Sequence, residues 1–68
     1  MTADQWIESF ARELGVDPPS EEEFATLLEL AGDAAHSSER IAAPIACWLV
    51  GRAGVSAEAA RELAARVG

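Results

Sequence analysis

Ten consecutive apolar residues, Ile41 to Val50, constrain this chain more than any other feature of its sequence. The run is too short to span a membrane, which takes roughly 20 such residues. On a helix it would be apolar on every face, which is typical of a helix surrounded by others. We therefore expect a central helix here, with Trp48 in the middle of the core and a buried, unreactive thiol at Cys47.

Two capping boxes precede this run. Thr2 with Gln5, and Ser20 with Glu23, each place a hydroxyl three residues before a side chain that can reach back to the backbone N–H of the hydroxyl-bearing residue. The stripes expected to face the core are Trp6, Ile7, Phe10 and Leu14, and then Phe24, Leu27, Leu28, Ala31, Ala34 and Ala35. The boxes and stripes predict two helices, over residues 3–14 and from 21 to about 35.

Pro44 leaves the start of the third helix open between two alternatives. Because proline lacks a backbone N–H and disfavours a helical residue before it, the helix begins either at 41–43, or at Ser38 with a kink. The glycines expected to end it are Gly51 and Gly54. Ser56 caps a fourth helix. Its expected inward residues are Ala59, Ala60, Leu63, Ala64 and Val67, with Arg61 and Arg66 facing out.

Four short helices with short connections predict an all-α fold, a compact bundle forming one domain over residues 1–68. A chain of this length buries only about 60% of its unfolded surface. Its one cysteine cannot form an internal disulfide. We therefore expect the domain to gain stability by association, as a homodimer or in a complex with another protein.

Charge is unevenly distributed along the chain. Residues 1–34 carry a net charge of −8 and residues 35–68 a net charge of +1, which together give −7. The acidic front half would repel nucleic acid and acidic membrane surfaces, so neither is expected as a partner. It is either a solvated face or a surface for a basic protein. The N-terminus has no basic and then apolar signal segment, which favours a cytoplasmic protein.

The sequence contains little that would support catalysis. A metal site needs three or four ligands at defined spacing, and the chain has one His and one Cys, eleven positions apart. No glycine-rich phosphate loop is present. A carrier-protein role lacks the Asp-Ser-Leu attachment motif, and a DNA-binding module conflicts with the negative charge. We therefore expect no enzyme activity, catalytic residues, metal or cofactor.

The polar segment before the apolar run is the candidate binding site, formed by His36, Ser38, Glu39 and Arg40. It combines an imidazole, a hydroxyl, a carboxylate and a guanidinium at the expected end of the second helix. Arg40 could bond to Asp33, to Glu39, or to a carboxylate or phosphate of a ligand. Two interpretations stay open: the segment binds a partner, or it only joins two helices.

The chain also resembles a known family, in the segments Asp4-Gln5-Trp6-Ile7, Leu14-Gly15-Val16, His36-Ser37-Ser38-Glu39-Arg40, Ala43-Pro44 and Leu49 to Gly51. The resemblance covers residues 4–52, and its most specific part is residues 36–44. It is to a small acidic helical domain of unknown function, found alone or fused to molybdenum cofactor guanylyltransferase-type proteins. The resemblance implies a role beside molybdopterin-guanine dinucleotide biosynthesis.

The prediction that follows is a non-catalytic accessory or interaction domain, associated with molybdenum cofactor biosynthesis. Its expected partner is a protein, with a molybdenum cofactor nucleotidyltransferase as the candidate. No catalytic residue carries over from that enzyme, because its glycine-rich nucleotide-binding segment is absent from this sequence. The alternative is a small structural or regulatory helical protein unrelated to the cofactor.

Overall fold

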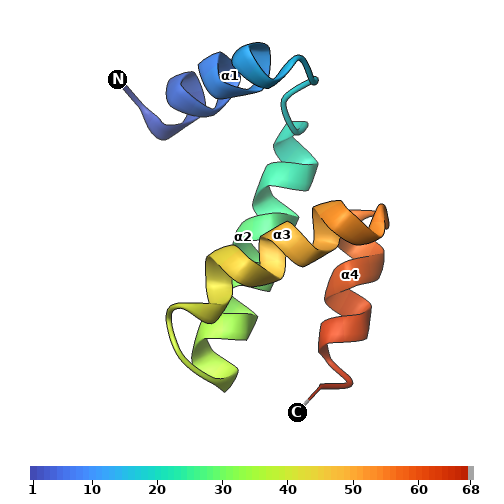
Figure 1. The fold of residues 1–68 in the computed structure, drawn as a ribbon. Helices are drawn as coiled ribbons and strands as arrows, with labels where there is room; N and C mark the ends of the chain where they lie inside the picture. Colours follow the sequence, from blue (N-terminus) through green and yellow to red (C-terminus); the bar gives the residue numbers. More distant parts are fainter. Residues whose placement is uncertain (68) are drawn as a thin grey trace.

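The computed structural model describes residues 1–67, and this part of the chain contains helices and no strand. The helices are α1 (Ala3–Leu14), α2 (Glu21–Ser37), α3 (Ala42–Ala53) and α4 (Ala57–Ala64). α2 is the longest, and both α3 and α4 pack on it (Figure 1). The predicted all-α bundle of four helices is confirmed.

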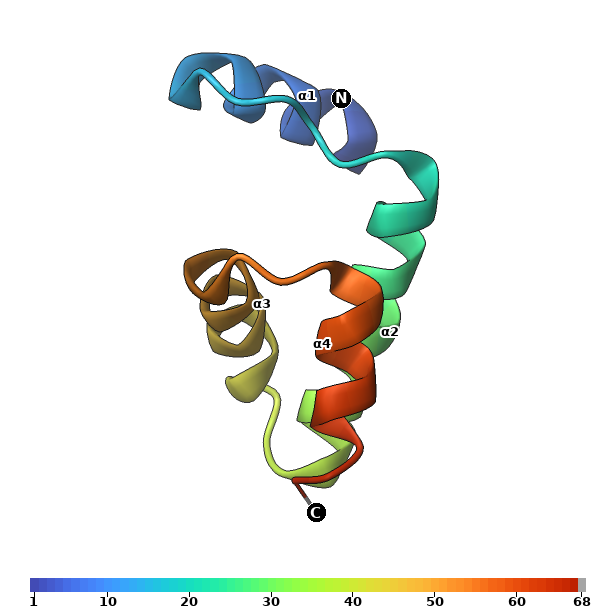
Figure 2. The same ribbon diagram turned by 90° about the vertical axis from the view of Figure 1, so that its right-hand side faces the viewer.

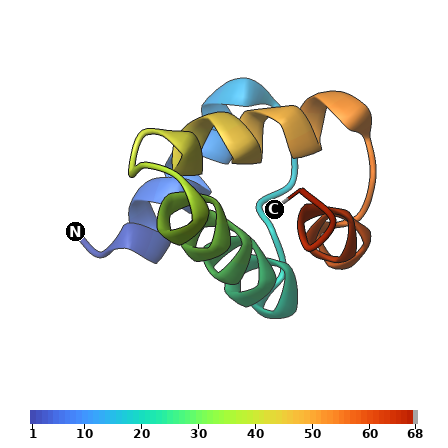
Figure 3. The same cartoon turned by 90° about the horizontal axis from the view of Figure 1, so that it is seen from below.

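The four helices are not equally covered. Seen from below, α3 and α4 cover α2 from two directions (Figure 3). α1 lies across the other end of α2, beyond a turn that contains Pro18 and Pro19 (Figure 2). Within residues 1–67, the extensive contacts between helices are those of α2 with α3 and of α2 with α4. Any contact that α1 makes with another helix is smaller.

Both predicted capping boxes are present. Thr2 Oγ1 accepts from the Gln5 N–H at 3.1 Å, and Gln5 Oε1 accepts from the Thr2 N–H at 2.9 Å. In the second box, Ser20 Oγ accepts from the Glu23 N–H at 3.1 Å, and Glu23 Oε1 accepts from the Ser20 N–H at 2.8 Å. α1 ends at Gly15, whose φ of 77° suits glycine. These local signals therefore determine where the first two helices begin and where α1 ends.

α3 begins at Ala42, which confirms the first alternative for its start. The Ala42 and Ala43 N–H groups donate to the carbonyls of Glu39 and Arg40, at 3.0 and 3.1 Å. Pro44 thus falls in the first helical turn, where its missing N–H is tolerated. The helix continues through Gly51 to Ala53, and Gly54, with φ 71°, caps its C-terminal end.

The prediction that Trp48 lies at the centre of the core is wrong. Its side chain is 62% exposed, and α3 has no buried residue. The Cys47 thiol is half-buried, not fully buried. The residues of α3 with least exposure are small or medium in size: Ala42, Ala43, Ala46, Cys47 and Val50. α3 is covered only where it meets α2, because α1 lies at the other end of the molecule.

The buried residues of the described chain are Ala11, Leu30, Ala57 and Ala60. In α2 the predicted stripe is half-buried except for Leu28, which is 62% exposed, and the fully buried residue of this helix is Leu30, outside the predicted stripe. In α4, Ala57 and Ala60 turn inward, while Leu63 and Val67, both predicted to be inside, are exposed. In α1, Trp6, Phe10 and Leu14 are exposed and Ala11 is buried. The predicted stripes are apolar faces, but most of their large side chains are not covered.

Candidate functional site

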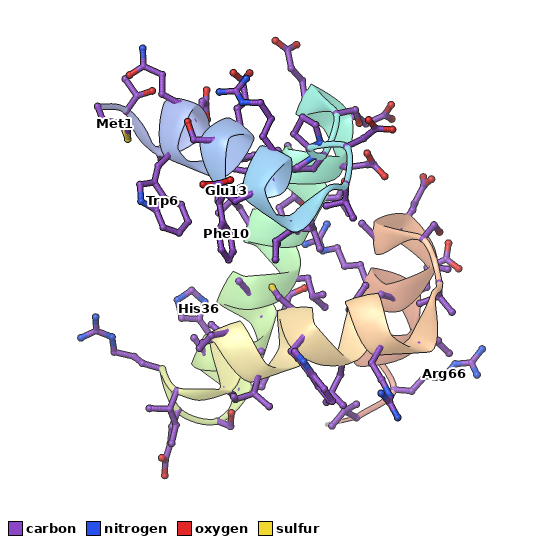
Figure 4. All side chains as sticks on the ribbon, turned by 45° about the horizontal axis from the view of Figure 1, so that its top comes forward. Met1, Trp6, Phe10, Glu13, His36 and Arg66 are labelled. Carbon is purple, nitrogen blue, oxygen red and sulfur yellow. The ribbon has the colours of Figure 1, made fainter. Side chains whose placement is uncertain are left out.

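The polar segment that the sequence singles out is the junction between α2 and α3. His36 lies in the last turn of α2, Ser38 caps its C-terminal end, and Glu39 and Arg40 form the turn before α3. Figure 4 shows His36 on α2, close to where the ribbon of α2 gives way to this turn. The structure thus places all four predicted residues at one helix junction.

The turn is held together by Ser38 and by the backbone. Ser38 Oγ donates to the carbonyl of Ala34 at 2.7 Å, which satisfies an otherwise free carbonyl of the last turn. The carbonyls of Glu39 and Arg40 accept the first N–H groups leading into α3. Ser38 is therefore a structural residue, as the joining interpretation predicts for it.

The other three side chains take no part in holding the turn. His36, Glu39 and Arg40 are exposed, and within residues 1–67 none of their side chains forms a hydrogen bond or an ion pair. The bonds considered for Arg40 with Asp33 and with Glu39 are not made. Within this part of the chain, the guanidinium of Arg40 is therefore available to bond to another molecule.

Asp33 is instead bonded to Arg61 of α4, a residue that the sequence pattern assigns to the outer face. Arg61 Nε donates to Asp33 Oδ2 at 3.1 Å, and the same guanidinium forms an ion pair with Glu29. The hydrogen bond to Asp33, assisted by the charge of Glu29, raises the pKa of Arg61. The four-residue spacing of the two acids indicates a shared helix face, but not which arginine meets them.

An open hollow adjoins the junction at the start of α3. It is lined by Ser38, Glu39, Ile41, Ala42, Pro44 and Ile45. The polar junction thereby continues directly onto apolar side chains of α3. A surface that combines charged groups with exposed apolar ones is typical of protein-binding sites.

A second groove lies between α1 and the start of α2. Its apolar wall includes Ile7, Phe24 and Leu28, and its acidic residues are Asp4, Glu8 and Glu21. None of these three carboxylates forms an ion pair within residues 1–67. This groove therefore combines apolar side chains with carboxylates that are unpaired within residues 1–67, and the two interpretations of the acidic half stay open.

Other kinds of site find little support in the part of the chain that the structure describes. No group of three or more His, Cys, Asp or Glu side chains there could hold a metal ion. No helix among the same residues is long and apolar enough to cross a membrane.

These features define a class: a small all-α domain with a polar helix junction and uncovered apolar helix faces. The chain belongs to the family described as a domain of unknown function (DUF6457), which it matches over residues 1–68. No curated protein and no solved structure matches it. The membership confirms that part of the resemblance which concerns a domain of unknown function.

Proposed function

We propose that this chain is a non-catalytic accessory domain that binds another protein through the α2–α3 junction. One observation carries the proposal: the side chains of His36, Glu39 and Arg40 are exposed at the α2–α3 junction and form no hydrogen bond or ion pair within residues 1–67. The turn is held without them, by Ser38 and the backbone. Side chains that folding does not use can be used to recognise a partner.

The non-catalytic part of the proposal is supported by where the reactive side chains lie. Nucleophilic catalysis requires a nucleophile within hydrogen-bond distance of its base. His36 is exposed at the end of α2, whereas Cys47 is half-buried on α3, and no hydrogen bond joins them. The junction therefore suits recognition better than chemistry.

The partner that we propose is a protein of molybdenum cofactor biosynthesis, with a nucleotidyltransferase of the guanylyltransferase type as the first to test. The support is the resemblance carried by residues 36–44. The net charge of −8 on residues 1–34 would guide encounter with a basic surface. In this proposal the domain works in the cytoplasm, together with that partner.

The test is the variant Arg40→Ala, measured by a melting curve and by a binding isotherm with the nucleotidyltransferase. We expect an unchanged melting temperature, because the Arg40 side chain has no bond within residues 1–67. We expect the affinity to fall by about 1–3 kcal/mol, the range for a hydrogen bond to a charged group. Arg66→Ala is the matched control, an exposed arginine on a different part of the chain.

The possible results separate the site from the partner. A lower melting temperature with unchanged affinity would show that Arg40 is structural and would overturn the binding site. No binding of the nucleotidyltransferase to the unmodified chain would overturn the link to the cofactor. It would favour the alternative, a structural or regulatory protein unrelated to the cofactor.

A further inference from the structure

α1 presents an apolar face that no helix covers within residues 1–67. Trp6, Phe10 and Leu14 are 53%, 47% and 60% exposed, although they recur every four residues as a core stripe does. The rings of Trp6 and Phe10 touch, with centroids 4.9 Å apart. Figure 4 shows both rings and Glu13 on the same side of α1. We call Trp6, Phe10, Glu13 and Leu14 the α1 face.

α3 has a second uncovered face, opposite the side that meets α2. Its large side chains, Ile41, Ile45, Trp48 and Leu49, are 73%, 59%, 62% and 55% exposed. The Arg52 guanidinium lies 5.9 Å from the Trp48 ring centroid, which fixes a cation at one end of this face. We call these five residues the α3 face.

The amount of exposed apolar surface suits a dimer. Each of the seven large apolar side chains exposes on the order of 100 Å², given the 150–250 Å² of a whole aromatic side chain. The two faces together therefore offer on the order of 700 Å² per copy, near the roughly 800 Å² per partner of a standard interface. Leu30 is the one large side chain among the buried residues of the described chain, so one copy has little core of its own.

The charges of the two helices favour a cross-pairing. α1 carries Asp4, Glu8 and Glu13 against Arg12, whereas α3 has no acid and carries Arg52. Two α1 helices would therefore repel each other, and two α3 helices would bring like charges together. An α1 helix placed against an α3 helix brings opposite charges together.

We propose that two copies of this chain form a two-fold dimer in which the α1 face of each covers the α3 face of the other. Trp6 and Glu13 are seven residues apart, as are Ile45 and Arg52. Parallel helices that place Trp6 on Ile45 of the other copy also place Glu13 beside its Arg52. Because the two-fold axis forms both α1–α3 contacts together, the exchange is reciprocal and the assembly closes at two.

The orientation of the helices within one copy is compatible with this arrangement. α1 and α3 both run from left to right in Figure 1, but they are not parallel, since Figure 2 shows α1 extended across the view and α3 foreshortened. A two-fold axis that bisects the directions of α1 and α3 brings α1 of one copy parallel to α3 of the other. The α3 face shares Ile41 and Ile45 with the hollow beside the junction, whereas His36, Glu39 and Arg40 lie outside both faces. The charge reversals that test the dimer and the Arg40→Ala variant that tests the proposed function therefore change different residues.

Charge reversal tests the pairing, with the molecular mass measured by sedimentation over a range of concentrations. Glu13→Arg alone and Arg52→Glu alone should each weaken the dimer by about tenfold, because each places like charges together at both symmetric contacts. The two substitutions combined should restore it. Glu8→Arg is the control, since Glu8 lines the groove toward α2 and not the α1 face.

Two results would overturn the proposal. The first is a monomer at every concentration up to the millimolar range, with the helical content of the unmodified chain intact. The second is a dimer that neither Glu13→Arg nor Arg52→Glu weakens, which would place another surface at the interface. Because Glu13 and Arg52 are exposed and form no ion pair within residues 1–67, both variants are expected to fold.

Discussion

The apolar side chains at the contact between α2 and α4 are buried to a different extent from those of α1. At the first, Leu30, Ala57 and Ala60 are buried, and Arg61 joins the helices by bonding to Glu29 and Asp33. In α1, a stripe of larger side chains remains about half exposed, and only Ala11 is buried. The smaller apolar face is therefore the better covered one.

The comparison shows that an apolar helix face in a sequence predicts burial, but does not identify the helix or molecule that buries it. Small residues let two helices approach closely, so α4 is covered by α2 within one chain. The large side chains of α1 and α3 lie where no other helix of residues 1–67 covers them. Such faces are typical of surfaces that bind other molecules.

Leu30→Ala should produce the largest effect and would break the contact between α2 and its neighbours. Leu30 is 3% exposed, so the substitution leaves a cavity and should lower the free energy of unfolding by about 2–5 kcal/mol. Urea unfolding measures this loss. Leu28→Ala, on the same helix and 62% exposed, should cost less than about 0.5 kcal/mol. Equal losses from the two variants would contradict the assignment of the core.

Arg61→Ala should produce the next largest effect, because it removes both bonds from α4 to Glu29 and Asp33. We expect a melting temperature lower by a few degrees at low salt, and a smaller difference at high salt, where exposed charges are screened. Arg66→Ala serves as the control, since Arg66 forms no ion pair within residues 1–67. A difference that salt leaves unchanged would show that Arg61 acts through packing alone.

Gly32→Ala sharpens the comparison, because it tests whether α2 is closely packed at this position. A methyl group at Gly32 would meet no atom within 4 Å. The substitution should therefore raise the free energy of unfolding, by up to about 1 kcal/mol, through helix propensity. Thermal unfolding measures the gain. A loss of stability would show that Gly32 permits a close approach after all.

The smallest expected effect concerns Glu23, at the start of α2 near α1. Hydrogen bonds from the Ser20 backbone and then from its hydroxyl lower the pKa of Glu23. A lowered pKa in the folded state means that this stabilisation is present above about pH 4 and is lost as the pH falls through the folded pKa. At neutral pH the unmodified chain should therefore unfold at a higher urea concentration than Glu23→Gln. The difference between their urea midpoints should become smaller in acid. For Glu22→Gln, outside the capping box, we expect no such trend.

The starts of the helices could be predicted because they depend on residues close together in the sequence. The capping boxes at Thr2 and Ser20, the Ser56 cap and the position of Pro44 all lie where the sequence places them. The end of α2 could not be placed as well, because Ser38 prolongs the helix to Ser37 through a bond to its last turn.

The covered side of α3 could not be predicted, because it depends on where the other helices lie. Ile41 to Val50 is apolar all round, so its pattern contains no information about which side meets α2. The same limit applies to the candidate site. The sequence identifies His36, Ser38, Glu39 and Arg40 as one junction, but not that Asp33 bonds to Arg61 and leaves Arg40 without an ion pair within residues 1–67.

The fluorescence of Trp6 and Trp48 tests most directly whether the large apolar side chains lie outside a single copy. At a dilution where sedimentation gives the mass of one copy, both indoles should emit as in water and be readily quenched by acrylamide, because they are 53% and 62% exposed. The emission should shift to shorter wavelength as the copies associate, and a Trp6→Phe variant separates the two signals. Short-wavelength emission that resists quenching at the same dilution would contradict the exposed faces, because the tryptophans would then be covered within one copy.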